Sequence, residues 1–276
     1  MKLYLSFIIA LIFHSSFSQS AWTKDKDALY TQLAFTTIND YNLIFGNPDY
    51  TTERNVTDNT LQFYGEYGLH DKTTLILNVP IKFIQTNDLV DSATGLTTAN
   101  SVSSLGNIEI GVRQRFYKNK WIISGQFNIE LNTSSFDNPS GIRTGFDSWA
   151  FTPTINFGRS FKKFYTQFFT GFNFRSNGYS TNFKLGGEIG TRPFKKILVI
   201  GFIDILKSFK DGDIVLPETN LLNVLYTNNQ EYGAYGIKFI SELTKSFGIN
   251  AGVGGAFFGQ NVAKEPALTL GIYHNF

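Results

Sequence analysis

The sequence contains no cysteine, few charged residues and no long apolar segment. Without cysteine, neither a disulfide framework nor a thiolate metal site is available. Charged residues make up only 17% of the 276 residues, whereas a soluble domain carries about a quarter. The apolar run from Leu3 to Phe13 is shorter than the roughly 20 residues that a transmembrane helix needs. These absences exclude a helical membrane protein and disfavour a cytoplasmic enzyme.

Aromatic residues and glycine are abundant by contrast. The chain has 28 Phe, 13 Tyr and 25 Gly. Few charges together with many aromatics suit a β-barrel wall whose outer face meets lipid and whose inner face is polar. The formal net charge of +2 gives no electrostatic footprint for nucleic acid.

The start of the chain has the features of a signal peptide. Lys2 forms a short basic region, the run from Leu3 to Phe13 is apolar, and small residues precede a cleavage site after Ser18. We therefore expect export with removal of residues 1–18, which leaves a single domain over residues 19–276. The expected location is the bacterial outer membrane.

Large apolar residues recur at every second position along the exported part. They do so from Leu61 to Leu69, except at Gly65, and again from Leu75 to Phe83, where Asn78 and Lys82 stand between them. Successive side chains of a strand point to opposite faces, so each run is predicted to be a two-faced strand. Their lengths of about 9 to 12 residues match a tilted crossing of the bilayer.

This pattern continues to the end of the chain and amounts to about twelve antiparallel strands. The first is expected around Ala28 to Ile38, and the last ends at Phe276. The predicted fold is therefore all-β, a single transmembrane antiparallel β-barrel. Pro80 and Pro153 fall within predicted strands, and because proline donates no ladder hydrogen bond we expect local distortions there.

Short and long links alternate between the predicted strands. Short links fall at 70–72, 118–120, 161–163, 192–196 and 244–246. Between them, long links lie near 39–58, 86–103, 132–147 and 208–229, with shorter ones near 176–180 and 259–264. Outer-membrane barrels show this asymmetry, with tight periplasmic turns and longer external loops. A soluble β-sandwich would also alternate, but it does not explain the links or the aromatic residues beside the short turns.

The last residues resemble the signal that the outer-membrane insertion machinery reads. Gly271 is followed by alternating residues and a terminal aromatic, Phe276, whereas His274 departs from a strictly apolar choice. The expected partners are accordingly this machinery and outer-membrane lipid.

The mature chain as a whole is similar to small outer-membrane barrels of the meta-pathway phenol-degradation-type transporter family, and to XagA-like outer-membrane proteins. The resembling residues are Ala21 to Thr23, the strand from Leu105 to Gly111, and the strand ending at Phe276. The resemblance implies passive passage of a small hydrophobic solute. Long-chain fatty-acid channels carry an N-terminal plug, but only Gln19 to Lys26 precede the first strand here, so a plug of that type is not expected.

The residues needed for catalysis or for a metal site are sparse. Barrel hydrolases place a histidine beside Ser or Asp near the outer rim, whereas His70 and His274 are both predicted at the periplasmic end. Asp211 and Asp213 offer two carboxylates where calcium takes six to eight oxygens. We therefore predict no enzymatic activity, no metal site and no cofactor.

Charged residues on the inward-facing side of the strands mark the predicted lumen. They mix signs, and a one-sign ring would instead indicate an ion-selective pore. One interpretation is a salt-bridge network that fills a narrow barrel, and the other is a polar constriction that gates small solutes, formed by Glu109, Arg113, Arg115 and Lys184. The full set comprises Glu66, Lys82, Glu109, Arg113, Arg115, Glu130, Arg175, Lys184, Glu188, Lys238 and Glu242.

Two predicted external loops are unusually apolar. The first contains Leu43 and Phe45, and the second contains Leu221, Leu222 and Leu225. Exposed apolar patches are a liability, so these residues either pack as a lid over the mouth or form a vestibule that collects hydrophobic solutes. Two functions stay open: a narrow channel or transporter for small molecules, and a non-transporting surface barrel whose loops bind a partner.

Overall fold

The computed structural model describes residues 20–87 and 99–276. The predicted signal peptide, Gln19 and the centre of the link predicted near 86–103 lie outside the described residues. The secondary structure of the described residues consists of β-strands and one short helix.

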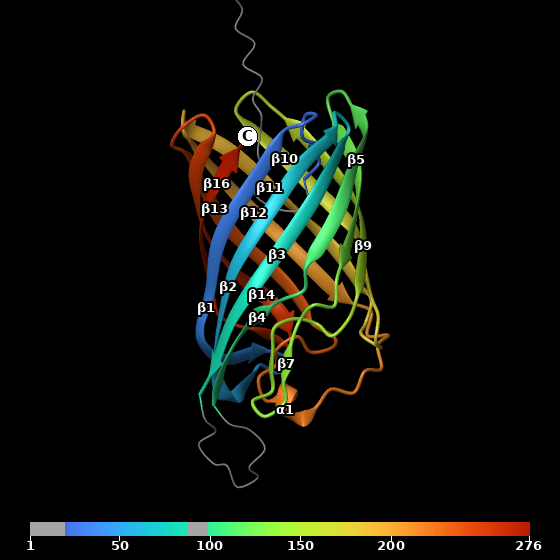
Figure 1. Cartoon of the computed structure of the whole chain (residues 1–276), viewed down its shortest axis with the longest axis vertical. Coiled ribbons are helices and arrows are strands. Elements are labelled where there is room, and N and C mark those ends of the chain that lie inside the picture. Colours follow the sequence, from blue (N-terminus) through green and yellow to red (C-terminus); the bar gives the residue numbers. More distant parts are fainter. Residues whose placement is uncertain (1–19, 88–98) are drawn as a thin grey trace, which may run out of the picture.

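The strands form one antiparallel sheet that closes on itself into a twelve-stranded barrel (Figure 1). The predicted fold class and strand number are therefore confirmed. Fourteen strand segments form the twelve strands of the wall. β4 and β5 pair with successive parts of the same edge of β3, and β15 and β16 do the same on one edge of β1, so each of these two pairs counts as one strand. The wall contains β1 (Leu29–Phe45), β2 (Tyr50–His70), β3 (Thr73–Thr86), β4 (Asn100–Leu105), β5 (Glu109–Lys118), β6 (Ile122–Glu130), β9 (Ala150–Ser160), β10 (Phe164–Arg175), β11 (Asn182–Phe194), β12 (Ile197–Ser208), β13 (Glu231–Glu242), β14 (Phe247–Gln260), β15 (Val262–Ala263) and β16 (Ala267–Asn275).

The first and last strands close the barrel. β1 pairs with β2 on one edge and with β16 on the other, in a register that runs from Tyr30 opposite Asn275 to Thr37 opposite Leu268. The backbone N–H of Phe276 donates to the carbonyl of Leu29 at 2.8 Å. The aromatic-ended final strand is thus the one that seals the wall.

The two ends of the barrel differ, and we call them the turn end and the loop end. The turn end carries the tight turns between strands and the C-terminus, as Figure 1 shows. The loop end carries the hairpin of β7 (Phe136–Asp137) and β8 (Ile142–Arg143) and the helix α1 (Glu218–Leu221). The predicted alternation of short and long links is confirmed, with one exception.

The exception is the region near 39–58, where the prediction of a long link is wrong. β1 continues to Phe45 and β2 begins at Tyr50, so the connection is a tight hairpin between two long strands. The register shifts between Ile38 and Leu43, with Asp40 at a φ of 48°. Because the pairing is irregular and the composition is polar here, the outer halves of both strands show no clear alternation in the sequence.

Both prolines lie where the ladder is interrupted, as predicted. Pro80 lies where β3 changes its partner from β5 to β4, and its carbonyl accepts from Gly106 N–H at 2.9 Å. Pro153 lies where two pairs of the β9–β10 ladder are missing. Proline without an N–H is tolerated at such positions because no ladder bond is lost.

Alternation places large apolar side chains on the outside of the wall. About two-fifths of the residue surface is exposed at Leu33 and Phe35 on β1, Leu75 on β3 and Phe168 on β10. The residues between such positions point into the lumen, and many of them are buried and polar. No helix in the described parts of the chain is long and apolar enough to cross a membrane. An apolar outer band around a polar lumen is the arrangement of a transmembrane barrel.

Candidate functional site

The lumen is closed at the turn end by the segment Ser20–Lys26, which we call the N-terminal plug. Ala21 N–H donates to the Gln167 Oε1 atom on β10 at 3.3 Å, and Lys24 N–H donates to the Thr74 hydroxyl on β3 at 2.8 Å. The plug therefore crosses the lumen from one side of the wall to the other. The sequence predicted no large plug, but these few residues are enough to span the opening.

A buried ionic cluster anchors the plug. Arg113 Nη1 donates to the Trp22 carbonyl and to Glu66 Oε1, both at 2.9 Å. Lys24 Nζ lies 3.3 Å from Glu66 Oε2, and Arg115 Nη1 donates to the Thr23 hydroxyl at 3.0 Å. Arg113 is 0% exposed and Glu66 is 3% exposed. Charge-assisted bonds in a dry site are the strong ones, so this cluster fixes the plug to β2 and β5.

An inward-facing layer of tyrosine and aliphatic residues surrounds Trp22. Its ring lies edge-on to that of Tyr165, with 5.7 Å between centroids. This layer was not predicted, because its members are not charged and the inward faces were recognised by their charged residues. The one sequence signal is the run from Ile197 to Ile205, which is apolar on both faces apart from Asp204. The layer consists of Tyr30, Tyr64, Ile76, Tyr165, Leu198, Ile200, Ile240 and Tyr273.

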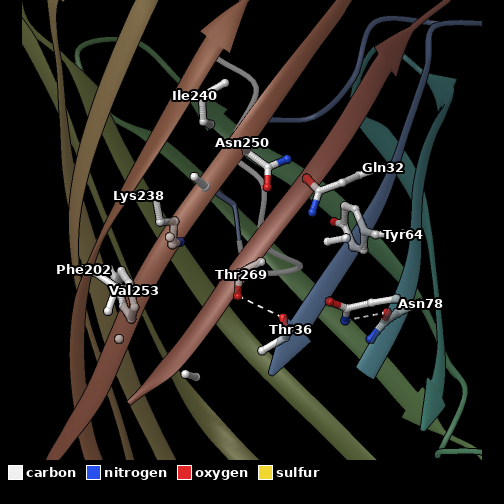
Figure 2. Close-up of a pocket in the computed structure, with 16 residues that line it drawn as sticks. Gln32, Thr36, Tyr64, Asn78, Phe202, Lys238, Ile240, Asn250, Val253 and Thr269 are labelled. Atoms are coloured by element: carbon white, nitrogen blue, oxygen red, sulfur yellow. Dashed lines mark hydrogen bonds between the residues drawn. The ribbon is translucent and has the colours of Figure 1, made fainter. Parts of the chain in front are cut away.

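A cavity of about 320 Å³ lies in the lumen above this layer (Figure 2). Its wall is formed by β12, β13, β14, β16, β1, β2 and β3. In Figure 2, Phe202 and Lys238 lie on one side, and Gln32, Tyr64 and Asn78 lie on the other. One side of the cavity thus presents an aromatic ring beside an ammonium group that is paired with Glu188, and the other presents amides and a phenol.

Small residues on β14 leave room for this cavity. A Cβ atom added at Gly252 would meet only the Ile237 carbonyl at 3.5 Å and Lys238 Cγ at 3.6 Å. At Gly254 it would meet the Phe202 ring at 3.1 Å. The glycine-rich run that the sequence shows here thus accommodates a large neighbour and an open space.

The lining is almost entirely uncharged. Gln62 Nε2 donates to Asn78 Oδ1 at 2.8 Å, which uses one atom of each amide. The hydroxyls of Thr36 and Thr269 are 2.9 Å apart, and Figure 2 marks both interactions. The wall across the barrel from the cavity, on β6, β9 and β10, is also neutral inside. Its buried amides and hydroxyls belong to Ser124, Thr154, Asn156 and Asn173.

Most of the predicted lumen charges lie in ion pairs of opposite sign. Lys82 Nζ lies 2.9 Å from an Asp58 carboxylate oxygen, and Arg175 Nη1 lies 2.9 Å from Glu130 Oε1. Lys24, Asp58 and Arg192 are partners that the sequence analysis did not single out. The remaining pairs are Arg113–Glu66 at 2.9 Å, Lys238–Glu188 at 3.5 Å and Arg192–Glu242 at 2.7 Å.

Two residues of the predicted constriction stand apart from these pairs. Glu109 and Lys184 are half-buried and lie on β5 and β11. Arg113 and Arg115 bind the N-terminal plug instead. The structure therefore separates the four residues predicted to gate solutes: two belong to the plug anchor, and two lie nearer the loop end.

The loop end is covered by residues 131–149 and 209–230, which we call the outer lid. Their apolar side chains pack on the extended outer halves of β1, β2 and β3. Arg54 Nη1 donates to the Ser140 carbonyl at 2.8 Å, and Arg143 Nε donates to Asn220 Oδ1 at 3.0 Å. The apolar cluster contains Tyr41, Ile44, Val56, Ile84, Ile142, Val224 and Leu225.

The predicted apolar loop residues divide between three environments. Leu225 is buried in this cluster, Leu222 is half-buried, and Leu221 is 52% exposed. Leu43 and Phe45 do not belong to a loop, because both lie in β1. That prediction was wrong since the strand extends beyond the bilayer-length run that the alternation indicated.

The outer lid touches the charged groups above the cavity. Lys82 Nζ lies 5.5 Å from the Tyr226 ring centroid, and the Arg175 guanidinium lies 3.8 Å from that of Phe146. Burial raises the pKa of Tyr226 to about 12, so this phenol stays neutral at physiological pH. No cluster of three or more metal-ligating side chains occurs in the described ranges.

No protein-family model matches the chain, and no curated protein matches it in sequence. An outer membrane channel from Pseudomonas putida F1 is similar in structure, with a TM-score of 0.70 at 13% identity, covering 93% of this chain and 98% of that one. The NanC porin gives 0.52 at 6% identity, with 89% and 98% covered. The translocator domain of the autotransporter NalP from Neisseria meningitidis gives 0.51 at 10% identity, with 90% and 87% covered. The likeness shows the fold of outer-membrane barrels, which serves channels and a translocator alike.

Proposed function

We propose that the protein is an outer-membrane channel for small molecules. The turn end then faces the periplasm and the loop end faces the exterior, as tight turns and long loops do in such barrels. The cavity between plug and outer lid is the observation that carries the proposal. Its volume of about 320 Å³ is at the small end of the range for ligand pockets, so the solute is a small one.

Export and insertion belong to the same proposal. Residues 1–18 act as a cleaved signal peptide, and Gly271 and Phe276 form part of the signal for the insertion machinery. Support for the second role comes from the place of β16, which pairs with β1 to close the wall. Outer-membrane lipid surrounds the apolar outer face.

The solute is proposed to be partly hydrophobic, as the resemblance to meta-pathway phenol-degradation-type transporters and XagA-like proteins implies. The apolar side chains of Phe202 and Ile240 in the cavity lining support this. Transport, and not catalysis, is the proposed activity, and we propose neither a cofactor nor a metal.

Swelling of liposomes that contain the purified barrel tests the channel. Swelling in a monosaccharide such as arabinose, with much slower swelling in a trisaccharide such as raffinose, is the expected result. Heat-modifiable gel mobility serves as the control for folding. Folded protein that gives no swelling above protein-free liposomes in any solute would contradict the proposal.

The second candidate is a non-transporting surface barrel whose outer lid binds a partner. Occlusion at both ends favours it: Ala21 of the plug is 0% exposed and Leu225 of the outer lid is 4% exposed. If liposomes with the folded protein do not swell, and still do not swell after removal of the plug, this candidate is supported over the channel.

A further inference from the structure

The central cavity has one polar group that no neighbour satisfies. Asn250 on β14 is 8% exposed and lines the cavity, and its Nδ2 atom has no hydrogen-bond partner among the described residues. A buried amide donor without a partner is costly, at about 1–3 kcal/mol. A guest molecule with an acceptor atom would remove that cost.

Other donors and acceptors surround the same space. Gln32 Oε1 accepts from the Tyr30 hydroxyl at 2.7 Å, which orients this amide. In Figure 2, Asn250 and Gln32 lie on either side of β16, and Asn78, which accepts a hydrogen bond from Gln62, lies beyond them. The strands hold these groups in fixed positions, so the hydrogen-bonding side is preorganised.

The side opposite Gln32 carries the aromatic ring of Phe202. Phe202 lies there beside the glycine run on β14, and Ile240 lines the cavity next to Asn250, its cross-strand partner. An aromatic ring and an aliphatic side chain bind the apolar body of a ligand through burial of its surface.

Charge is nearly absent from the lining. Among the described residues that line the cavity, Lys238 is the one formally charged side chain, and its ammonium group already contacts Glu188 at 3.5 Å and the Phe202 ring at 4.6 Å. The carboxylate of Glu66, below the cavity, is bound by Arg113. A charged guest would lose its water without gaining an unengaged counter-ion, which is unfavourable in a buried site.

We propose that the cavity is a binding site for an uncharged amphipathic molecule with a compact apolar body and a hydroxyl or carbonyl group that bonds Asn250. The apolar body lies against Phe202 and Ile240, and the polar group faces Asn250 and Gln32. The inference deepens the proposed channel function and rests on it, because it names the class of solute that this lumen accepts.

Three molecules of the same shape test the class: cyclohexanol, cyclohexanecarboxylate and cyclohexylammonium at neutral pH. Binding is followed by NMR of the barrel in lipid nanodiscs with ¹⁵N-labelled Asn and Gln side chains. The Asn250 resonance is identified by its loss in Asn250→Leu. Cyclohexanol is expected to shift the Asn250 and Gln32 resonances saturably, with each ion binding at least about tenfold more weakly.

Matched variants separate the site from general effects. Asn250→Leu should weaken cyclohexanol binding about five- to tenfold, read from Gln32 and Gln62, because one hydrogen bond is lost. Asn156→Leu replaces another buried, unpartnered asparagine outside the cavity, and it should leave the affinity unchanged. Gly252→Val, whose Cβ meets no atom closer than 3.5 Å, should fill the cavity and abolish the shifts.

Equal or tighter binding of either ion would overturn the inference, and so would an absence of saturable shifts with cyclohexanol. The channel proposal fails separately. A barrel that conducts but does not bind cyclohexanol contradicts the ligand class alone, whereas a barrel that binds it but never admits a solute contradicts transport.

Discussion

Replacement of Glu66 by Gln should release the N-terminal plug. The carboxylate accepts from Arg113 at 2.9 Å and from the Tyr64 hydroxyl at 2.8 Å, and it lies 3.3 Å from Lys24 Nζ. Glutamine keeps the size of the side chain but removes its charge. Both cations then stay in the closed lumen without the carboxylate that they contact.

The size of the effect follows from the burial of this cluster. Removal of one partner from a buried ion pair costs about 3–5 kcal/mol. Release of the plug lets water reach Arg113, which is 0% exposed in the closed state, so the cost applies mainly to the closed form. With about 3 kcal/mol, the population of the released form rises roughly 100-fold.

A cysteine in the plug reports this population directly. Ser20→Cys is nearly isosteric, Ser20 is 4% exposed, and the chain has no cysteine of its own. The rate of maleimide labelling should therefore rise roughly 100-fold when Glu66→Gln is added. Glu130→Gln is the matched control, because Glu130 pairs with Arg175 away from the plug. Equal labelling rates with and without Glu66→Gln, in folded protein, would refute the reasoning.

Three further predictions concern the outer lid and the final strand. Leu225→Ala should destabilise the outer lid by about 2–5 kcal/mol and speed proteolysis within residues 209–230, whereas Leu221→Ala, at a site 52% exposed, should not. The Ser140 hydroxyl and the Asn100 amide hold the pKa of Asp137 below its usual value of 3.8. Because the pKa of Asp137 is lower in the folded protein, its ionised form stabilises the outer lid at pH values above the ordinary pKa, and this stabilisation is lost as the pH falls through the folded pKa. Hydrogen exchange in residues 136–143 should therefore speed up in acid. Asp137→Asn should remove this pH dependence. Phe276→Ser should lower the yield of heat-modifiable barrel in the outer membrane without changing the stability of the molecules that do fold, since Phe276 is 71% exposed; unchanged yield would contradict its role in insertion.

The strands of the barrel wall were predictable where alternation is strong. Leu75, Leu77 and Phe83 face outward, and the strand that ends at Phe276 closes the wall. Alternation fades towards the loop end, where both faces of a strand can be polar. For that reason the outer halves of β1 and β2, around Asp40 and Asn55, looked like a loop.

The plug and the cavity could not be read from the sequence. Residues 20–26 show no periodicity, and their contacts at Glu66, Thr74, Arg113 and Gln167 are brought together only by closure of the barrel. Charged lumen residues were recognisable one by one, but their pairing was not. Neutral residues such as Asn250 are unremarkable in the sequence and become candidates only because the barrel buries them without a partner.

Single-channel recording in a planar bilayer tests the central claim most directly. We expect small, discrete conductance steps from the full barrel, and larger or longer openings after deletion of residues 20–26, because the plug crosses the lumen between β3 and β10. Heat-modifiable mobility would establish that both proteins are folded. Folded barrels that stay silent with and without the plug would contradict a channel.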